Sequence, residues 1–284
     1  MGFETVSPVV TMNMAISAVI SVGLPIVLLI VWKKRNRSTV RLSPFIAGAV
    51  TYIVFAMVLE SMCHQFFIGR DSAVSRFVNG NTWVYILYAA LAAGIFEETG
   101  RLFTFHFFMK NDNNKEASIT YGIGHGGAES ILLVGIAMIS NLAMVVSLNS
   151  MGGLDAYVAS VPAESQEAVR TGLSVLYTTP AYMYLIGGIE RISAVFLHIG
   201  LSVLVFEAAK RPGKWYLYPV AIGLHALTDA FAVMYQKQVI TSMVLTEVLV
   251  VLMMLVTVYL AYRVYKKDKE TDGDTDTDRM ILRQ

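Results

Sequence analysis

Long runs of apolar residues, separated by short polar connections, dominate this sequence. A helix needs about 20 mostly apolar residues to cross the hydrocarbon core of a bilayer. Seven segments are long enough, with approximate bounds 9–32, 43–66, 83–109, 118–148, 180–209, 215–236 and 239–263. The pattern therefore predicts an all-α integral membrane protein with about seven transmembrane helices.

The segments outside these runs complete the expected organisation. The connection 149–171 is polar and long enough to carry a short surface helix, and Pro180 stands near the start of the fifth run, where proline is tolerated. The first run follows no basic segment, so we interpret it as a retained span rather than a cleaved signal peptide. We expect one polytopic domain over residues 1–265 and a hydrophilic tail over 266–284.

The loop cations predict the orientation, because Lys and Arg are enriched in cytoplasmic loops. One side of the predicted bundle carries most of them: Lys33, Lys34, Arg35, Arg37, Arg41, Lys110, Lys115, Lys210, Arg211, Lys214, Arg263, Lys266, Lys267 and Lys269. The loops of the other side carry Arg70, Arg76, Arg170 and Lys237. The N-terminus is therefore expected outside, and the C-terminus in the cytoplasm.

Composition supports the membrane environment and narrows the chemistry. The chain is 55% hydrophobic and 15% charged, whereas a soluble domain is about 25% charged. A formal net charge of +1 leaves no basic face for nucleic acid. The single cysteine, Cys63, forms no internal disulfide or Cys-rich zinc site, so a metal here would need His and carboxylate ligands.

Ionisable residues inside the predicted spans stand out, because they are costly in a membrane and are usually functional. Ten lie in the interior of the third to sixth spans, away from the span ends: Glu97, Glu98, Arg101, His125, Glu129, Glu190, Arg191, His198, His225 and Asp229. Glu60, His64 and Glu247 fall outside this group; we expect an interfacial role for the first two and an interhelical hydrogen bond or a protonated acid for Glu247.

Spacing and depth both predict that these residues meet. On a helix, residues three or four apart share a face. Three pairs have a spacing of four: Glu97 with Arg101, His125 with Glu129, and His225 with Asp229. In the predicted topology Glu97, Glu129, His198 and His225 lie on the order of 15–20 Å from the cytoplasmic ends of their helices, close to the bilayer midplane. We therefore expect spans three to six to form a four-helix catalytic core around one site.

The residue types in this group suit hydrolysis at a metal. Histidine nitrogens and carboxylate oxygens bind zinc, and three protein ligands leave a fourth position for water. Paired glutamates supply a general base, and Arg101 offsets part of their charge. The glycines around His125 would let a helix or an extended substrate approach closely. For any one motif, structural hydrogen bonds, salt bridges of Arg101 and Arg191, or glycine packing would serve equally well; only the joint pattern favours a site.

At these residues the sequence resembles the YhfC-type family of intramembrane metalloproteases, related to the CAAX prenyl protease and bacteriocin-processing family and to the PrsW-type proteases. The run Glu97-Glu98-Thr99-Gly100-Arg101 looks like the paired-glutamate motif, and Glu129 stands where the second motif falls. His198, and His225 with Asp229, look like the later histidine motifs. The likeness covers residues 90–235. Asp229 departs from the Asn of the prenyl-protease branch, and Glu129 from its His.

The resemblance implies an intramembrane endopeptidase of the bacterial cytoplasmic membrane. Its substrate would be a membrane-embedded or lipid-linked peptide, with Glu97, Glu98 and Arg101 catalytic and with Glu129, His198 and His225 as ligands of zinc or another divalent metal, if a metal is required. His125, Glu190, Arg191 and Asp229 would support them. The alternatives are a divalent-cation or proton transporter, a non-catalytic immunity-like membrane protein, and a haem protein with two axial histidines.

Overall fold

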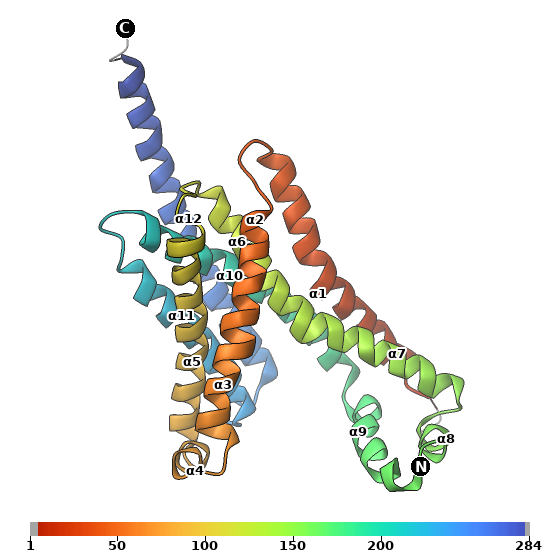
Figure 1. Cartoon of the computed structure of the whole chain (residues 1–284). Coiled ribbons are helices and arrows are strands. Elements are labelled where there is room, and N and C mark those ends of the chain that lie inside the picture. The colour runs from red at the N-terminus through yellow and green to blue at the C-terminus, as the bar shows by residue number, and fades with distance from the viewer. Residues whose placement is uncertain (1–4, 282–284) are drawn as a thin grey trace. The chain divides into compact units, whose positions relative to one another are not determined.

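Helices make up the fold of this protein, as the apolar pattern predicted. The computed structural model describes residues 5–281, and over these residues it contains helices and connecting loops but no strand (Figure 1). Six helical segments of the described chain are long and apolar enough to cross a membrane: Pro8–Arg35, Ser43–Gly69, Glu116–Ser150, Ala181–Lys210, Leu217–Gln236 and Met243–Lys267. The protein is therefore an all-α integral membrane protein.

The remaining predicted span, 83–109, is also a continuous helix. Helix α5 (Thr82–Phe103) begins where the Asn81 side chain accepts a hydrogen bond from the Val84 amide at 3.1 Å, and it continues as the wider winding of η3 (Thr104–Phe108). Three charged residues in its second half lower its apolar character below that of the other six. A seventh span, and the orientation of the bundle, stay predictions.

Contacts divide the described chain into two compact units. The first unit comprises the residues up to Val27 together with Glu129–Ile192, and the second comprises Leu28–Ala128 and the residues from Ser193 onward. The chain passes between the units within α1 (Pro8–Arg35), α6 (Glu116–Glu129) and α10 (Ala181–Lys210). That residues 1–265 form one domain stays a prediction.

The first unit contains the polar connection between the fourth and fifth predicted spans. Besides its parts of α1 and α10, it holds η4 (Ser130–Gly135), α7 (Ile136–Ser150), α8 (Leu154–Ala159), η5 (Ala163–Ser165) and α9 (Gln166–Thr178). Leu148, Leu154 and Leu176 are buried together in its core. The short helix predicted within 149–171 is confirmed by α8, and α9 extends the helical structure further along the chain.

The second unit holds the helices that carry most of the predicted site. They are α2 (Ser43–Thr51), η1 (Tyr52–Glu60), α3 (Ser61–His64), η2 (Gln65–Gly69), α4 (Ala73–Gly80), α5, η3, α6, the later part of α10, α11 (Leu217–Gln236) and α12 (Met243–Ile281). A core of apolar residues that includes Phe105, Tyr121, Leu201 and Phe206 joins η3, α6 and α10.

Glycines bring the helices of the second unit unusually close together. A methyl group at Gly122 would lie 2.6 Å from the Ile199 backbone on α10, and one at Gly124 would lie 2.0 Å from the Phe45 carbonyl on α2. On α5, a methyl group at Gly94 would lie 2.8 Å from the Ile222 carbonyl on α11. Small residues let membrane helices approach in this way. The glycines beside His125 thus pack against helices, one of the two uses that the sequence suggested.

Candidate metal and catalytic centre

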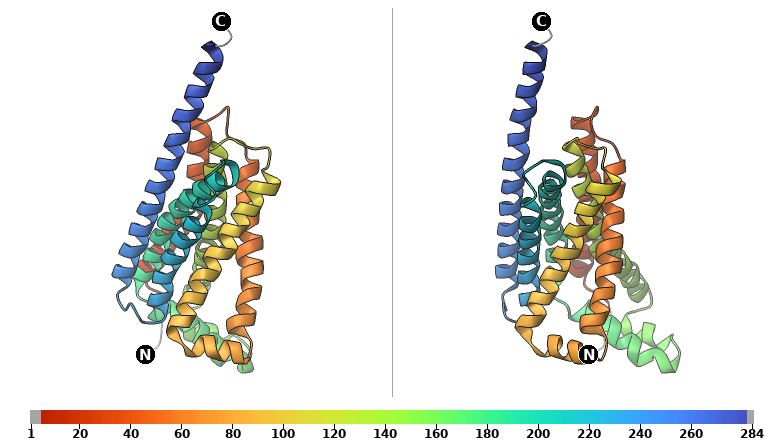
Figure 2. Two further views of the ribbon diagram at one scale, coloured as in Figure 1. Left: turned by 90° about the vertical axis from the view of Figure 1, so that its left-hand side faces the viewer. Right: turned by 60° about the vertical axis from the view of Figure 1, so that its left-hand side comes forward.

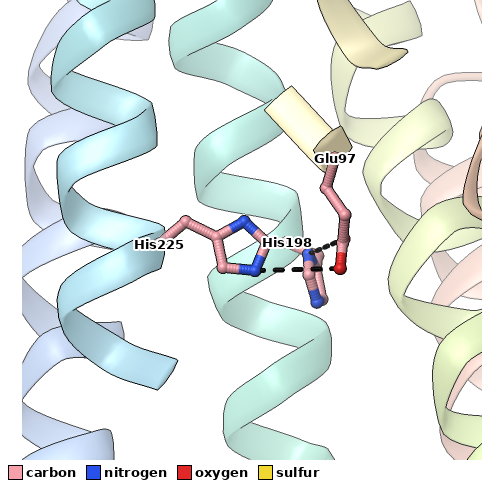
Figure 3. A group of neighbouring side chains, drawn as sticks. All are labelled: Glu97, His198 and His225. Atoms are coloured by element: carbon pink, nitrogen blue, oxygen red, sulfur yellow. Dashed lines mark ion pairs between the residues drawn. The ribbon is translucent and has the colours of Figure 1, made fainter. Parts of the chain in front are cut away.

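Seven of the ten predicted residues lie on four helices of the second unit. Helix α5 carries three, α6 and α10 carry one each, and α11 carries two: Glu97, Glu98, Arg101, His125, His198, His225 and Asp229. Figure 3 shows the side chains of Glu97, His198 and His225 pointing toward one another from three of these helices. The close approach of α5 and α11 at Gly94 places the glutamates one turn further along α5 against the histidine of α11.

Glu97 lies at the centre of this group. Its Oε2 atom accepts a hydrogen bond from His125 Nε2 at 2.7 Å and lies 3.9 Å from His198 Nδ1. Its Oε1 atom lies 3.9 Å from His225 Nε2. The residue is only 7% exposed, so its carboxylate is surrounded by three imidazoles in a buried setting where electrostatic interactions are strong.

Glu98 is fully buried and fixes the orientation of His225. Its Oε1 atom accepts a hydrogen bond from His225 Nδ1 at 2.7 Å. Because that nitrogen is engaged, the other one, Nε2, is left facing Glu97, and it also lies 3.5 Å from Asp229. A carboxylate on the far nitrogen of a histidine is the usual way in which proteins orient an imidazole toward a metal.

Arg101 is the only Arg or Lys in this group of seven residues, and it is completely buried. Its Nη2 atom donates to His198 Nδ1 at 2.6 Å and lies 3.6 Å from Glu97 Oε2, while Nη1 lies 3.4 Å from Glu98 Oε1. A guanidinium can only donate hydrogen bonds, so His198 Nδ1 accepts here. One cation thus faces both glutamates and holds one imidazole in place.

Glu97, His198 and His225 fit the requirements of a divalent metal. Each offers one ligand atom, and these three atoms lie within 4.8 Å of one another. Two nitrogens and one oxygen form a donor set that zinc accepts. In a tetrahedral zinc site these atoms would lie about 3.4 Å apart. The two 3.9 Å distances from Glu97 would have to shorten by about half an ångström, and a separation of 4.8 Å by about 1.4 Å. Arg101 would also have to release His198 Nδ1 if that nitrogen were the ligand.

The three other predicted residues form a separate cluster in the first unit. Arg191 Nη1 lies 2.7 Å from Glu129 Oε1, and Arg191 Nη2 lies 2.6 Å from Glu190 Oε1. Arg191 is 7% exposed. Glu129 was predicted as a metal ligand; in this structure its carboxylate is engaged in an ion pair, and it is not among the three residues that bring ligand atoms together.

Two tyrosines border the centre that the sequence analysis did not single out. The ring of Tyr52 meets His125 edge-on at a centroid distance of 5.4 Å, and Tyr121 stacks on the same imidazole at 6.0 Å. Tyr121 precedes His125 by four residues, so helical spacing could have found it. Tyr52 lies on η1, and no local signal links it to His125. Both rings shield this imidazole from lipid.

Comparison with known proteins gives two matches. The model of a family described as YhfC intramembrane metalloprotease matches residues 20–250. The uncharacterized membrane protein YhfC of Bacillus subtilis (strain 168) is 37% identical over 246 residues, covering 87% of this chain and 93% of that protein. No solved structure matches the chain. The family match includes all seven residues of the centre.

Proposed function

Because this chain belongs to the YhfC intramembrane metalloprotease family, we propose that its Glu–His centre hydrolyses a peptide bond within or beside the membrane. The observation that carries the proposal is the position of Glu97. Its carboxylate accepts a hydrogen bond from His125, and its two oxygens each lie 3.9 Å from a further histidine nitrogen. At 3.9 Å these atoms are too far apart for a direct hydrogen bond, and one small ligand, a water molecule to the side or a metal ion, can contact both.

Glu97 is the general base in this proposal. It takes a proton from water as the water oxygen attacks the scissile carbonyl carbon, and it then passes the proton to the departing amine nitrogen, so that the C–N bond breaks. Arg101 Nη2 lies 3.6 Å from the same carboxylate. The guanidinium can donate a hydrogen bond to the oxyanion that forms on the carbonyl oxygen.

Glu98 and Arg101 position the reacting groups. Glu98 holds His225 through Nδ1, and Arg101 holds His198 through Nδ1. Arg101 also faces both carboxylates, so it offsets part of the negative charge that two neighbouring glutamates concentrate in a buried site. Asp229 adds a second carboxylate beside His225 Nε2.

The family name and the donor set support a metal at this centre. Glu97, His198 and His225 would hold it, and a bound divalent metal would make water more acidic and polarise the carbonyl. With Glu97 bound to the metal, Glu98 would be the neighbouring carboxylate left for proton transfer, and it would have to turn away from His225 to take that role. Without a metal, Glu97 is the base and Glu98 positions His225. Zinc is the metal that we propose for this nitrogen and oxygen set.

A membrane-embedded or lipid-linked peptide is the proposed substrate. His125, His198 and His225 all stand on helices that are long and apolar enough to cross a membrane. A peptide bond of the substrate reaches these residues most easily if the substrate chain is already in the bilayer. The relative from Bacillus subtilis is described as a membrane protein, and we propose the cytoplasmic membrane of a bacterium as the location of this chain.

A comparison of membrane peptides tests this function. Full-length protein is reconstituted into liposomes with membrane peptides and lipopeptides extracted from Bacillus subtilis, and new peptide termini are measured by mass spectrometry. We expect the wild type to generate termini that Glu97→Gln does not. The proposed function would be wrong if neither protein produced new termini, or if both produced them at equal rates.

Glu60→Gln is the matched control for this experiment. Glu60 is also a buried glutamate of a candidate span, and it pairs with a histidine, His64, at 3.2 Å. It lies outside the group of seven residues. We therefore expect Glu60→Gln to cleave at the wild-type rate, which separates loss of the base from a general effect of removing a buried carboxylate.

A further inference from the structure

A second feature of the second unit lies away from the catalytic centre, against the outer helix α12. Here four candidate spans surround an apolar hollow of about 260 Å³. Its walls come from α1, α6, α10 and α12, and residues from these helices include Trp32, Ile119, Phe196, Val203 and Val258. Both views of Figure 2 show α12 running beside α10 and α11.

Aromatic side chains of the kind found at membrane interfaces surround one end of this hollow. Trp32, Tyr262 and Tyr265 all line it, and each stands within a few residues of the end of its candidate span. Trp and Tyr prefer the level of the lipid headgroups. The Trp32 indole N–H donates to the Glu116 carbonyl at 3.4 Å, which ties α1 to the start of α6. This end of the hollow therefore reaches the headgroup level.

Positive charge gathers at the same end. Lys33 and Lys34 follow Trp32 directly, and Lys266 and Lys267 follow Tyr265; all four side chains are exposed. Lys115 stands one residue before α6 and completes the group. We call these five residues the lysine cluster. Clusters of basic residues beside apolar grooves between membrane helices suit anionic lipid headgroups.

Lys115 gives an independent indication that an anion belongs here. The residue is only 8% exposed, and its ammonium finds no hydrogen-bond partner among the residues that the structure describes. It lies instead 4.9 Å from the centre of the Tyr265 ring, which lines the hollow. A buried ammonium without a hydrogen-bond partner is costly, and a phosphate oxygen would supply that partner.

We propose that this hollow binds an anionic phospholipid, with one hydrocarbon chain between α10 and α12 and its phosphate at the lysine cluster. The apolar walls exclude a free anion as the natural occupant, because they offer it nothing to bond. The lysines select a negatively charged headgroup over a zwitterionic one. The site is independent of peptide hydrolysis, since none of its lining residues belongs to the catalytic group.

Native mass spectrometry of the full-length protein in detergent tests the proposal. The probes are dioleoylphosphatidylglycerol, dioleoylphosphatidylcholine with the same chains, and inorganic phosphate. We expect the phosphatidylglycerol to bind at least about fivefold more tightly than phosphatidylcholine, with phosphate not retained. Lys115→Gln should reduce that preference by about fivefold, the loss expected for one lysine at a lipid headgroup. Lys110→Gln, an exposed lysine outside the cluster, should leave it unchanged.

A second variant tests the chain-binding part of the site and does not depend on Lys115. Val258 is half-buried on α12 and lines the hollow, so Val258→Phe should fill it and weaken binding of both lipids. Equal affinity for the two lipids in the wild type would overturn the proposal. So would retention of inorganic phosphate as tight as that of phosphatidylglycerol, or unchanged lipid binding by Val258→Phe.

Discussion

Two buried clusters of carboxylates and cations distinguish the two units of this protein. In the first unit, Arg191 contacts two carboxylates at 2.7 and 2.6 Å. In the second unit, Arg101 lies 3.4 and 3.6 Å from Glu98 and Glu97, and its shortest contact is with an imidazole. The residue types are similar, but in the first cluster the shortest bonds of the acids are to arginine, whereas in the second the shortest bonds of the acids are to histidines at 2.7 Å.

The two clusters differ in whether their groups can transfer protons or bind a metal. An arginine with short contacts to two carboxylates forms an ion-pair cluster in which its guanidinium holds one oxygen of each acid. An imidazole can accept or donate a proton or bind a metal. A glutamate that is bonded to a histidine therefore has a partner for proton transfer or metal binding, which an arginine cannot be. Glu97 and Glu98 bond to His125 and His225 in this way. We therefore assign structure to the Arg191 cluster and function to the Glu97 centre.

The sharpest test of this assignment compares the two clusters by rate. Glu97→Gln should lower peptide hydrolysis by about 10²–10⁴-fold, the contribution of a positioned general base. Glu129→Gln should stay within a few-fold of the wild type once folded protein is counted. The measurement is the initial rate of appearance of the peptide termini described above. A comparable loss in both variants would remove the distinction.

The Arg191 cluster should instead determine stability. Arg191→Met leaves two carboxylates without their cation, that of Glu129 with 13% of its side chain exposed and that of Glu190 with 33%. The free energy of unfolding should therefore fall by up to about 3 kcal/mol, the lower end for a buried pair. Glu129→Gln should cost less, because Arg191 keeps its contact with Glu190. Both changes are measured by denaturant unfolding of the purified protein in detergent. An Arg191→Met protein as stable as the wild type would contradict the structural role.

Zinc affinity should depend on the carboxylates of the Glu97 centre and not on those of the Arg191 cluster. Glu98 holds the far nitrogen of His225, and loss of such a carboxylate weakens metal binding by about 10–100-fold in other metal sites. Glu98→Gln should therefore lower zinc affinity by that factor in a titration of metal-free protein. Glu190→Gln, its counterpart in the other cluster, should leave the titration unchanged. Equal zinc affinity of Glu98→Gln and the wild type would argue against a metal held by His225.

The smallest effect concerns helix packing beside the centre. Gly94→Ala places a methyl group 2.8 Å from the Ile222 carbonyl of α11, so we expect a loss of about 1–3 kcal/mol in the free energy of unfolding. Gly223 has no atom within 4 Å of such a methyl group. Gly223→Ala should therefore be neutral or slightly stabilising, since alanine favours a helix over glycine. A similar change at both positions would contradict the close approach of α5 and α11.

Much of the fold followed from the apolar pattern, because about 20 apolar residues in a row have few alternatives to a membrane helix. The third predicted span was the hardest to assign. Its first half is apolar, as in a membrane helix, but its second half carries Glu97, Glu98 and Arg101, as in a functional site. The two-unit division could not be predicted either, because it depends on contacts between helices that are far apart in sequence.

The site was predictable as a set of residues but not as a set of pairs. Spacing grouped Glu129 with His125, since residues four apart on a helix share a face. Long side chains, however, bond to whichever partner the packing of helices brings within reach. Arg191 therefore pairs with Glu129, and His125 with Glu97. Sequence spacing shows which face of its own helix a side chain occupies. It does not show which neighbouring helix packs against that face.

The arrangement of charges on α5 has a consequence for how the chain is made. Glu98 and its partner His225 are 127 residues apart, so the glutamates enter the membrane well before α11 has been synthesised. Arg101 is three and four residues from them, and it lies on the same helix at 3.4 and 3.6 Å. The nascent helix can therefore neutralise part of its own charge as soon as it forms. Arg101 is thus a partner of the two glutamates that is already present before the histidines that contact them are synthesised.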